Sequence, residues 1–107
     1  MDGMPNDLQG MIQKAQEMQQ KLRETQEKIK ELEFEGTSGG GMVKITLGGD
    51  RHIINIEISD DVVNPDDKDM LYDMIKAAHT NAIEQVNQHI EDSMKEVTGG
   101  LSIPGLF

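Results

Sequence analysis

The chain has 107 residues, a length that suits one ordinary domain. Only 36% of the residues are hydrophobic and 3% aromatic, so the core of one copy is thin, and we expect a second copy to complete it. The formal net charge of −10 opposes binding to polyanions at long range. Any surface that binds nucleic acid must therefore be a local basic one, set apart from the acidic body.

Cysteine usage and the amino-terminal sequence favour a cytoplasmic protein. Without cysteine the chain forms neither disulfides nor thiolate metal sites, which fits a reducing compartment. The first ten residues have no basic segment followed by an apolar run, so we expect no secretory signal. No stretch approaches the ~20 apolar residues of a membrane span, so we expect no membrane partner.

Residues 7–33 predict a long helix after a flexible amino terminus over residues 1–6. Asn6 is a candidate N-cap, and good helix formers dominate the segment. Apolar residues recur at two heptad positions, interrupted by Thr25, and form a coiled-coil-like seam. The candidate seam residues are Leu8, Met11, Ala15, Met18, Leu22, Ile29 and Leu32. A helix of ~27 residues is ~40 Å long, so its seam needs a second helix or a second subunit.

Residues 34–59 predict a small antiparallel sheet, either a hairpin or three strands. Alternation of apolar and polar residues marks two strands, each with one buried face. The residues expected on the buried faces are Val43, Ile45 and Leu47 in one strand and Ile54, Ile56 and Ile58 in the next. The glycines and aspartate at 48–50 form the turn between them, and residues 34–37 are candidates for a third strand.

Three consecutive glycines at 39–41 stand just before the first of these two strands. A phosphate-binding loop follows a strand and opens a helix, so that backbone amides and the helix dipole meet the anion. These glycines instead follow a long helix and open a strand, and Lys44 lies inside that strand. The context favours a turn or bulge, where glycine tolerates positive φ and close backbone approach.

Residues 64–97 predict a second long helix. Asn64 is a candidate N-cap with Pro65 at the first helical position, and Gly99 and Gly100 stop the helix. An apolar stripe at four-residue steps consists of Met70, Met74, Ala78, Ala82, Val86, Ile90 and Met94. The broad first half of this stripe suits packing on the sheet, and its narrower second half suits a helix or a partner. Residues 98–107 follow as an apolar tail. The fold class is therefore α+β, with two long helices around a small antiparallel sheet.

The ionisable residues indicate no catalytic, metal or cofactor site. His79 and His89, ten residues apart, do not share a ligand face, and no serine or carboxylate forms an evident triad with a histidine. The acidic cluster at 60–69 lacks the alternating spacing of a calcium loop and fits a helix start. We therefore expect no enzyme activity, no metal, no cofactor and no small-molecule substrate.

Half of the ten basic residues lie on the first helix. They are the candidate DNA-binding residues Lys14, Lys21, Arg23, Lys28 and Lys30. The lysines at 14, 21 and 28 form one line beside the seam, which two copies could present to phosphates. The alternative is a solvated ladder, in which Glu17 pairs with Lys21 and Glu24 with Lys28 for ~0.2–0.5 kcal/mol per pair. Arg23 and Lys30 face elsewhere and are the freer cations.

The order of motifs along the chain resembles the YbaB/EbfC family of bacterial nucleoid-associated proteins. The motifs that carry the resemblance are "LQGMIQKAQEMQQKL", "GTSGGGMVKITLGG", "IEIS", "DDKDMLYDMIKAAHTNA" and the tail "GGLSIPGLF". The resemblance implies an intertwined, tweezer-like homodimer in which the central sheets and helices join the subunits and helical arms project. Beyond the helix seam, the candidate dimer residues are then Val43, Ile45, Ile54 and Ile56.

The resemblance also implies a function, the binding of double-stranded DNA with low or modest sequence specificity in nucleoid organisation or gene expression. Cations on paired helical arms contact backbone phosphates in this interpretation, while the acidic body faces away. The alternative is a dimeric protein-interaction module of the same fold with little affinity for DNA, which the net charge of −10 favours. A continuous positive band on the arms supports DNA, and alternating charges support a protein partner.

Overall fold

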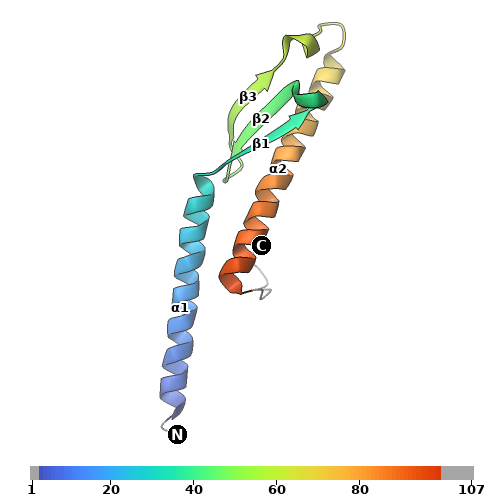
Figure 1. Ribbon diagram of the computed structural model, residues 1–107. Helices are drawn as coiled ribbons and strands as arrows, with labels where there is room; N and C mark the ends of the chain where they lie inside the picture. Colours follow the sequence, from blue (N-terminus) through green and yellow to red (C-terminus); the bar gives the residue numbers. More distant parts are fainter. Residues whose placement is uncertain (1–2, 100–107) are drawn as a thin grey trace.

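The computed structural model describes residues 3–99 and places side chains from Leu8 onward. In chain order the elements are α1 (Gly3–Lys30), β1 (Glu33–Ser38), η1 (Gly39–Gly41), β2 (Val43–Gly48), β3 (Ile53–Ile58), η2 (Asp60–Val62) and α2 (Lys68–Thr98), where η marks a short 3-10 helix. The strands form one antiparallel sheet in the order β1-β2-β3. α2 runs along this sheet, and α1 projects beyond it beside the second half of α2 (Figure 1). The predicted α+β fold is confirmed, with three strands in the sheet.

The main core lies between the sheet and α2. Val43, Ile45 and Leu47 of β2 are at most 1% exposed and pack against α2, as their alternation predicts. The residues of α2 that face them include Ala78 and Ala82, which are fully buried. Such small side chains let the helix approach the sheet closely, so the middle of the predicted stripe faces the sheet, while Met94 at its end packs on α1.

Gly36 of β1 marks the closest approach between the sheet and α2. A Cβ at this position would overlap the carbonyl oxygen of Ala78 and both the amide nitrogen and the Cβ of Ala82. Two residues further along β1, the Ser38 hydroxyl donates to the carbonyl oxygen of Met74 at 2.6 Å. Backbone contact and a direct hydrogen bond therefore fix β1 on the helix.

The three consecutive glycines form the tight turn between β1 and β2. The φ angles of Gly39, Gly40 and Gly41 are +59°, +66° and +93°, in the left-handed region that glycine occupies without steric cost. Gly39 also lies against Met74, whose methyl carbon would overlap an added Cβ. The turn interpretation is confirmed, and these glycines lead into a strand rather than an α-helix.

α2 begins at Lys68, later than the predicted start at residue 64. Asn64 instead caps the preceding turn: its Oδ1 accepts from the Asp66 N–H at 2.9 Å, and its carbonyl oxygen accepts from the Asp67 N–H at 3.0 Å. Asp67 is the N-cap, and its side chain accepts from the Met70 N–H at 3.3 Å. Asparagine and aspartate are both strong N-cap residues, so the local sequence contains two competing start signals.

The other helix ends differ less from the prediction. α1 spans Gly3–Lys30 rather than residues 7–33, so part of the terminus that was expected to be flexible is helical, and the chain enters β1 at Glu33. At the end of α2, Gly99 adopts a φ of +66° and caps the helix, as predicted. The rest of the predicted apolar tail, residues 100–107, lies outside the described residues.

A β-bulge in β3 changes which isoleucines share a face. Ile53 lies opposite Leu47 of β2, and the register shifts by one residue at Ile54. The isoleucines that this register places on the helix side of the sheet are Ile53, Ile56 and Ile58, so the bulge adds Ile53 to the predicted set. Because α2 packs chiefly on β1 and β2, the first two of these side chains remain 50% and 44% exposed.

The described chain is strongly elongated. Its extents are 78 × 21 × 17 Å and its radius of gyration is 20.8 Å, compared with about 13 Å for a compact domain of this length. An elongated chain covers little of its own apolar surface. This shape agrees with the thin core that the composition predicts.

Candidate nucleic-acid interface

The second half of α1 packs against the end of α2, and together they form a two-helix arm. Leu22 and Ile29 of α1 are buried with Met94 of α2, and Met18 packs against them. We define the arm as α1 together with residues 88–98 of α2. The middle of the predicted helix seam is therefore satisfied within one chain.

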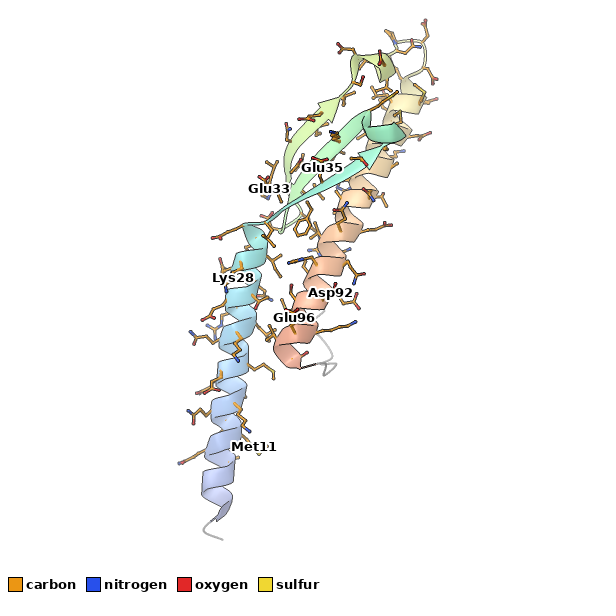
Figure 2. The ribbon with its side chains drawn as sticks, viewed as in Figure 1. Met11, Lys28, Glu33, Glu35, Asp92 and Glu96 are labelled. Atoms are coloured by element: carbon orange, nitrogen blue, oxygen red, sulfur yellow. The ribbon has the colours of Figure 1, made fainter. Side chains whose placement is uncertain are left out.

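The first half of α1 extends beyond α2, and its apolar seam is uncovered in this chain. Leu8, Met11 and Ile12 are 59%, 67% and 50% exposed, and Ala15 is exposed too. Met11 lies where no other described element runs beside α1 (Figure 2). Leu32, the last predicted seam residue, is 41% exposed. The two ends of the seam therefore remain open to a partner.

The candidate dimer residues of the sheet fall into two groups. Val43 and Ile45 are buried against α2 of the same chain. Ile54 and Ile56 on β3 are each 44% exposed. The second group is therefore accessible to another chain.

The five candidate DNA-binding cations on α1 are all exposed, but their pairing differs from the expected ladder. Glu24, the expected partner of Lys28, accepts a hydrogen bond from Gln20 at 3.3 Å. Lys30, expected to be free, pairs with Glu27 at 3.4 Å. Among the side chains from residue 8 onward, the α1 cations that make no ion pair are Lys14, Lys21, Arg23 and Lys28. The Glu–Lys ladder is therefore not formed.

The cations flank the buried seam on both sides of α1. Lys21 and Arg23 precede and follow one buried seam residue, Leu22. In the same way, Lys28 and Lys30 precede and follow Ile29, the next buried seam residue. Because successive residues of an α-helix are about 100° apart, each pair straddles the face that packs on α2. Lysine and arginine side chains therefore lie on both flanks of the arm, where they alternate with the exposed carboxylates of Glu17, Glu24 and Glu27.

Negative charge gathers on the open face of the sheet, which α2 does not cover. In the register of the sheet, Glu33 and Glu35 of β1 and Glu57 of β3 share this face with Lys44 of β2. Figure 2 shows the first two glutamates on β1, beyond the end of α1. The acidic sheet face is thus a different surface from the cationic flanks of the arm.

A further cation, Arg51, lies on the loop between β2 and β3. Its φ is +72°, a left-handed conformation that is uncommon for residues other than glycine. Its Nε and Nη2 both donate to Oδ1 of Asn87 on α2, at 3.1 and 2.6 Å. A single cation in a turn gives no periodic signal, which is why the sequence pattern did not indicate it.

Next to Arg51, the loop holds a carboxylate that is already engaged. The ring nitrogen of His52 bonds to the Asp50 carboxylate, whose Oδ1 also accepts from the His52 backbone N–H at 3.3 Å. These hydrogen bonds, the one from the ring first, lower the pKa of Asp50 below its ordinary value. Asp50 is therefore ionised at neutral pH and turned to its own loop.

Other features that the sequence singled out do not form a site in the described residues. The ring of His89 packs on Phe34, with ring centroids 5.5 Å apart, so this histidine contributes to packing. No group of histidine and carboxylate side chains suited to hold a metal ion occurs between residues 8 and 99. Neither described helix contains a segment long and apolar enough to cross a membrane.

The fold and the exposed cations define a small α+β protein with a projecting helical arm that can face a polyanion. The sequence profile of the YbaB/EbfC DNA-binding family matches residues 4–101. Because this match spans nearly the whole chain, the protein belongs to the YbaB/EbfC DNA-binding family. The resemblance in the order of its motifs is thereby confirmed.

Named relatives and a solved structure agree with this assignment. Nucleoid-associated protein BH0035 of Halalkalibacterium halodurans is 47% identical over 73 residues, which cover 68% of this chain and 71% of that protein. Nucleoid-associated protein YaaK of Bacillus subtilis is 41% identical over 73 residues, which cover 68% of each chain. The crystal structure of the uncharacterized protein HP0035 from Helicobacter pylori shares the fold, with a TM-score of 0.71 and 22% identity over 86% of this chain and 94% of that one.

Proposed function

We propose that this protein is a nucleoid-associated protein that binds double-stranded DNA with low sequence specificity and acts in nucleoid organisation or gene regulation. Family membership and the relatives named nucleoid-associated proteins support the proposal. The observation that carries it is the set of exposed cations without ion pairs on α1, above all Lys21, Arg23 and Lys28. Lysine and arginine side chains neutralise backbone phosphates whatever the base sequence. We place the protein in the cytoplasm, associated with the nucleoid.

Exposed cations on α1 give an acidic protein a surface that can meet a polyanion. The total charge is −10, and much of it lies away from α1, on the open sheet face and over residues 60–73, while exposed glutamates alternate with the cations on α1 itself. Phosphates at the arm are near the cations, while salt screens the more distant acidic face over about 8–10 Å. Phosphate contacts position a protein on DNA without reading bases, which accounts for the low specificity.

We also propose a homodimer, because α2 covers one edge of the sheet with hydrogen bonds and leaves the other edge open. Side chains of α2 cover the outer edge of β1: the Thr37 N–H donates to Asn81 Oδ1 at 3.1 Å. In the same way, Gln85 Nε2 donates to the Glu35 carbonyl oxygen at 2.7 Å. Within the described chain, no side-chain hydrogen bond covers the outer edge of β3. β3 is therefore the unprotected edge of the sheet.

The side chains of β3 support its role as the dimer edge. Ile53, Ile54 and Ile56 are 50%, 44% and 44% exposed. An open strand edge beside large apolar side chains is a template for pairing with another chain, and a second copy supplies an identical strand. Joining two copies in this way makes one continuous sheet with two projecting arms. This arrangement agrees with the intertwined, tweezer-like dimer.

The alternative function, a dimeric protein-interaction module with little DNA affinity, is less well supported. The net charge of −10 and the alternating exposed charges on α1 favour it, but the expected Glu–Lys pairs are not formed in the structure. Membership of a DNA-binding family favours DNA as the partner. Absence of DNA binding in the following experiment would restore the alternative.

A double variant tests α1 as the contact surface. Lys21→Gln with Arg23→Gln removes the cations on both sides of Leu22 and leaves the buried seam unchanged. By fluorescence anisotropy at low salt, we expect the affinity for a labelled duplex of ~30 base pairs to fall about tenfold or more. The slope of log K against log salt should decrease in magnitude by about two, one for each lost phosphate contact.

A matched variant separates local contacts from total charge. Lys68→Gln with Lys76→Gln removes the same charge at the opposite end of α2, where both side chains are exposed. We expect its affinity to stay within about twofold of wild type at the same salt. Equal weakening by both double variants would show that net charge alone sets the affinity, and unchanged affinity in the first would exclude α1.

A further inference from the structure

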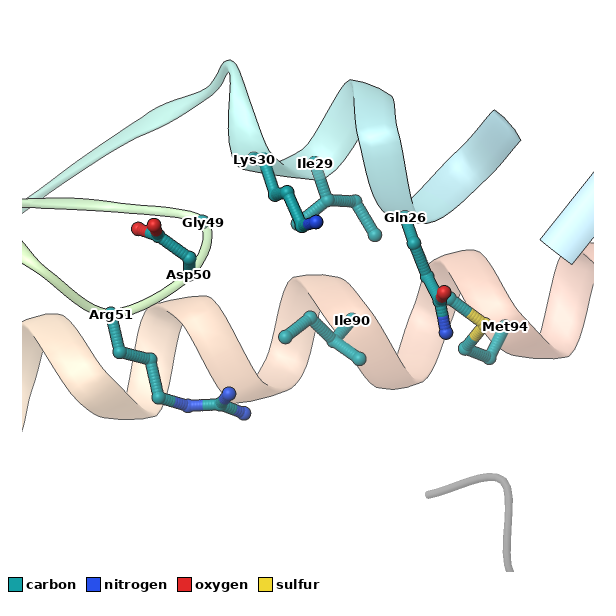
Figure 3. Close-up of a pocket in the computed structure, with 8 residues that line it drawn as sticks. All are labelled: Gln26, Ile29, Lys30, Gly49, Asp50, Arg51, Ile90 and Met94. Atoms are coloured by element: carbon teal, nitrogen blue, oxygen red, sulfur yellow. The ribbon is translucent and has the colours of Figure 1, made fainter. Parts of the chain in front are cut away.

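A cleft of about 430 Å³ lies where the end of α1, the β2–β3 loop and α2 meet (Figure 3). Its apolar wall is formed by Ile29, Ile90 and Met94. Gln26, Lys30 and Arg51 are the amide and the cations that line it. The cleft therefore combines a low-polarity wall, near which charge interactions are stronger than in open water, with two positive groups.

The guanidinium of Arg51 is positioned before any ligand binds. Asn87 Oδ1 accepts from its Nε and Nη2, and Figure 3 shows the side chain extended along α2 towards Ile90. A guanidinium has five N–H donors, so three remain for a ligand in the described structure. A planar fork with free donors suits the oxygens of a phosphate.

The backbone of Arg51 is strained in a way that glycine would avoid. Its φ of +72° lies in the left-handed region, where arginine is rare. Non-glycine residues in such conformations persist where the surrounding structure holds them, and they cluster at functional sites. Gly49, two residues earlier, packs on the carbonyl group of Ile29 with no room for a Cβ. The loop is thus fixed on α1, and Arg51 is held at the cleft.

Two carboxylates belong to the surroundings of the cleft, since Asp50 lines it and Glu27 pairs with its lysine, and both are already engaged. The Asp50 carboxylate is bonded by His52 and, in Figure 3, points away from Lys30 and Ile90. Glu27 pairs with Lys30 at 3.4 Å, but both side chains are more than half exposed, and such a pair is weak. Lys30 is therefore free to exchange this carboxylate for a stronger anion.

We infer that this cleft binds a phosphate group, with Arg51 and Lys30 as its ligands and Asn87 as the residue that positions Arg51. Resting on the proposed function, the inference places a backbone phosphate of bound DNA at the base of the arm. No aromatic side chain lines the described cleft, so it offers nothing on which a nucleobase could stack. A backbone phosphate or a free phosphate ion has the required chemistry.

Arg51→Gly tests the site without straining the loop, because glycine accepts the positive φ while the guanidinium is lost. We expect the affinity for the ~30-base-pair duplex at low salt to fall about tenfold, and the salt slope to decrease in magnitude by about one. Lys76→Gln, which removes one charge far from the cleft, is the control and should change neither. The melting temperature of each variant shows that the fold is retained.

Two further variants distinguish the role of Arg51 as a phosphate ligand from the role of Asn87 as the residue that positions it. Arg51→Lys keeps the charge but loses the planar fork, so we expect the wild-type salt slope with a reduced affinity. Asn87→Ala removes the acceptor that orients Arg51 and should likewise lower affinity without changing the salt slope. Affinity equal to wild type in Asn87→Ala would show that Arg51 needs no positioning.

The outcomes distinguish this inference from the proposed function. If wild-type protein and Arg51→Gly bind DNA equally, the cleft is not a contact, and the proposed function stands. If wild-type protein does not bind the duplex, the proposed function fails, and inorganic phosphate alone then tests the cleft by NMR. A shift of the Arg51 Nε–H signal that saturates with phosphate would support a site for free phosphate. An unmoved signal would overturn the inference.

Discussion

Individual glycines determine where this chain packs backbone against backbone. Gly36 lets α2 contact β1 directly at Ala78 and Ala82, and Gly49 lets the β2–β3 loop contact the carbonyl group of Ile29. A lone glycine in a strand signals close approach, but the sequence does not say which segment approaches. The sequence therefore indicates a special position, and only the packed structure supplies its partner.

A substitution at Gly36 measures this close approach. Gly36→Ala places a methyl group on the backbone of Ala78 and Ala82, and we expect a loss of about 1–3 kcal/mol in the free energy of unfolding. Gly10→Ala is the matched control, because an added Cβ there meets no atom within 4 Å on α1. The control should gain about 0.5–1 kcal/mol. Denaturant unfolding that gave both variants the same stability would show that β1 and α2 do not pack closely.

The candidate site was also only partly predictable at the level of residues. Lys21 and Lys28 follow the heptad that defines the seam, so their places beside it can be read from spacing alone. The freedom of Lys28 from its expected ion pair could not be read in this way, because Gln20 donates a hydrogen bond to Glu24. Arg51 follows no period, and its role depends on a contact with Asn87, 36 residues away.

At the scale of elements, the sequence predicted types well and boundaries less well. Strict alternation in β2 predicted its buried face, because the side-chain period of a strand is two. The start of α2 was wrong, because Asn64 and Asp67 are both suitable caps and the turn at Asn64 takes precedence. The bulge at Ile54, which brings Ile53 to the same face as Ile56, was not predicted, because alternation gives no sign of an extra residue in a strand.

The open edge of β3 leads to a prediction about assembly. Ile56→Lys places a charge in the proposed contact between two copies, and we expect the dissociation constant of the dimer to rise at least about tenfold. Val63→Lys is the control, because Val63 is 54% exposed but lies outside the strand. Light scattering during gel filtration at several concentrations gives the mass. A variant with the wild-type dimer mass at every concentration would exclude β3 as the dimer edge.

At the scale of the whole molecule, shape and charge distribution explain why an acidic chain can belong to a DNA-binding family. The chain extends over 78 Å, and its exposed cations without ion pairs on α1 lie along one end of this length. The acidic sheet face lies beyond α1, near the other end. The net charge of −10 is therefore a sum over the chain, and the surface that we propose for DNA carries exposed cations that alternate with carboxylates.

The most direct test of this account is the salt dependence of duplex binding by the wild-type protein. Fluorescence anisotropy with a labelled duplex of ~30 base pairs should show binding at about 50 mM salt that weakens roughly 100-fold at about 200 mM, as expected for about four neutralised phosphates. Duplexes of unrelated sequence should give similar affinities. No binding even at the lower salt concentration would contradict the account and would indicate that the arms hold another protein.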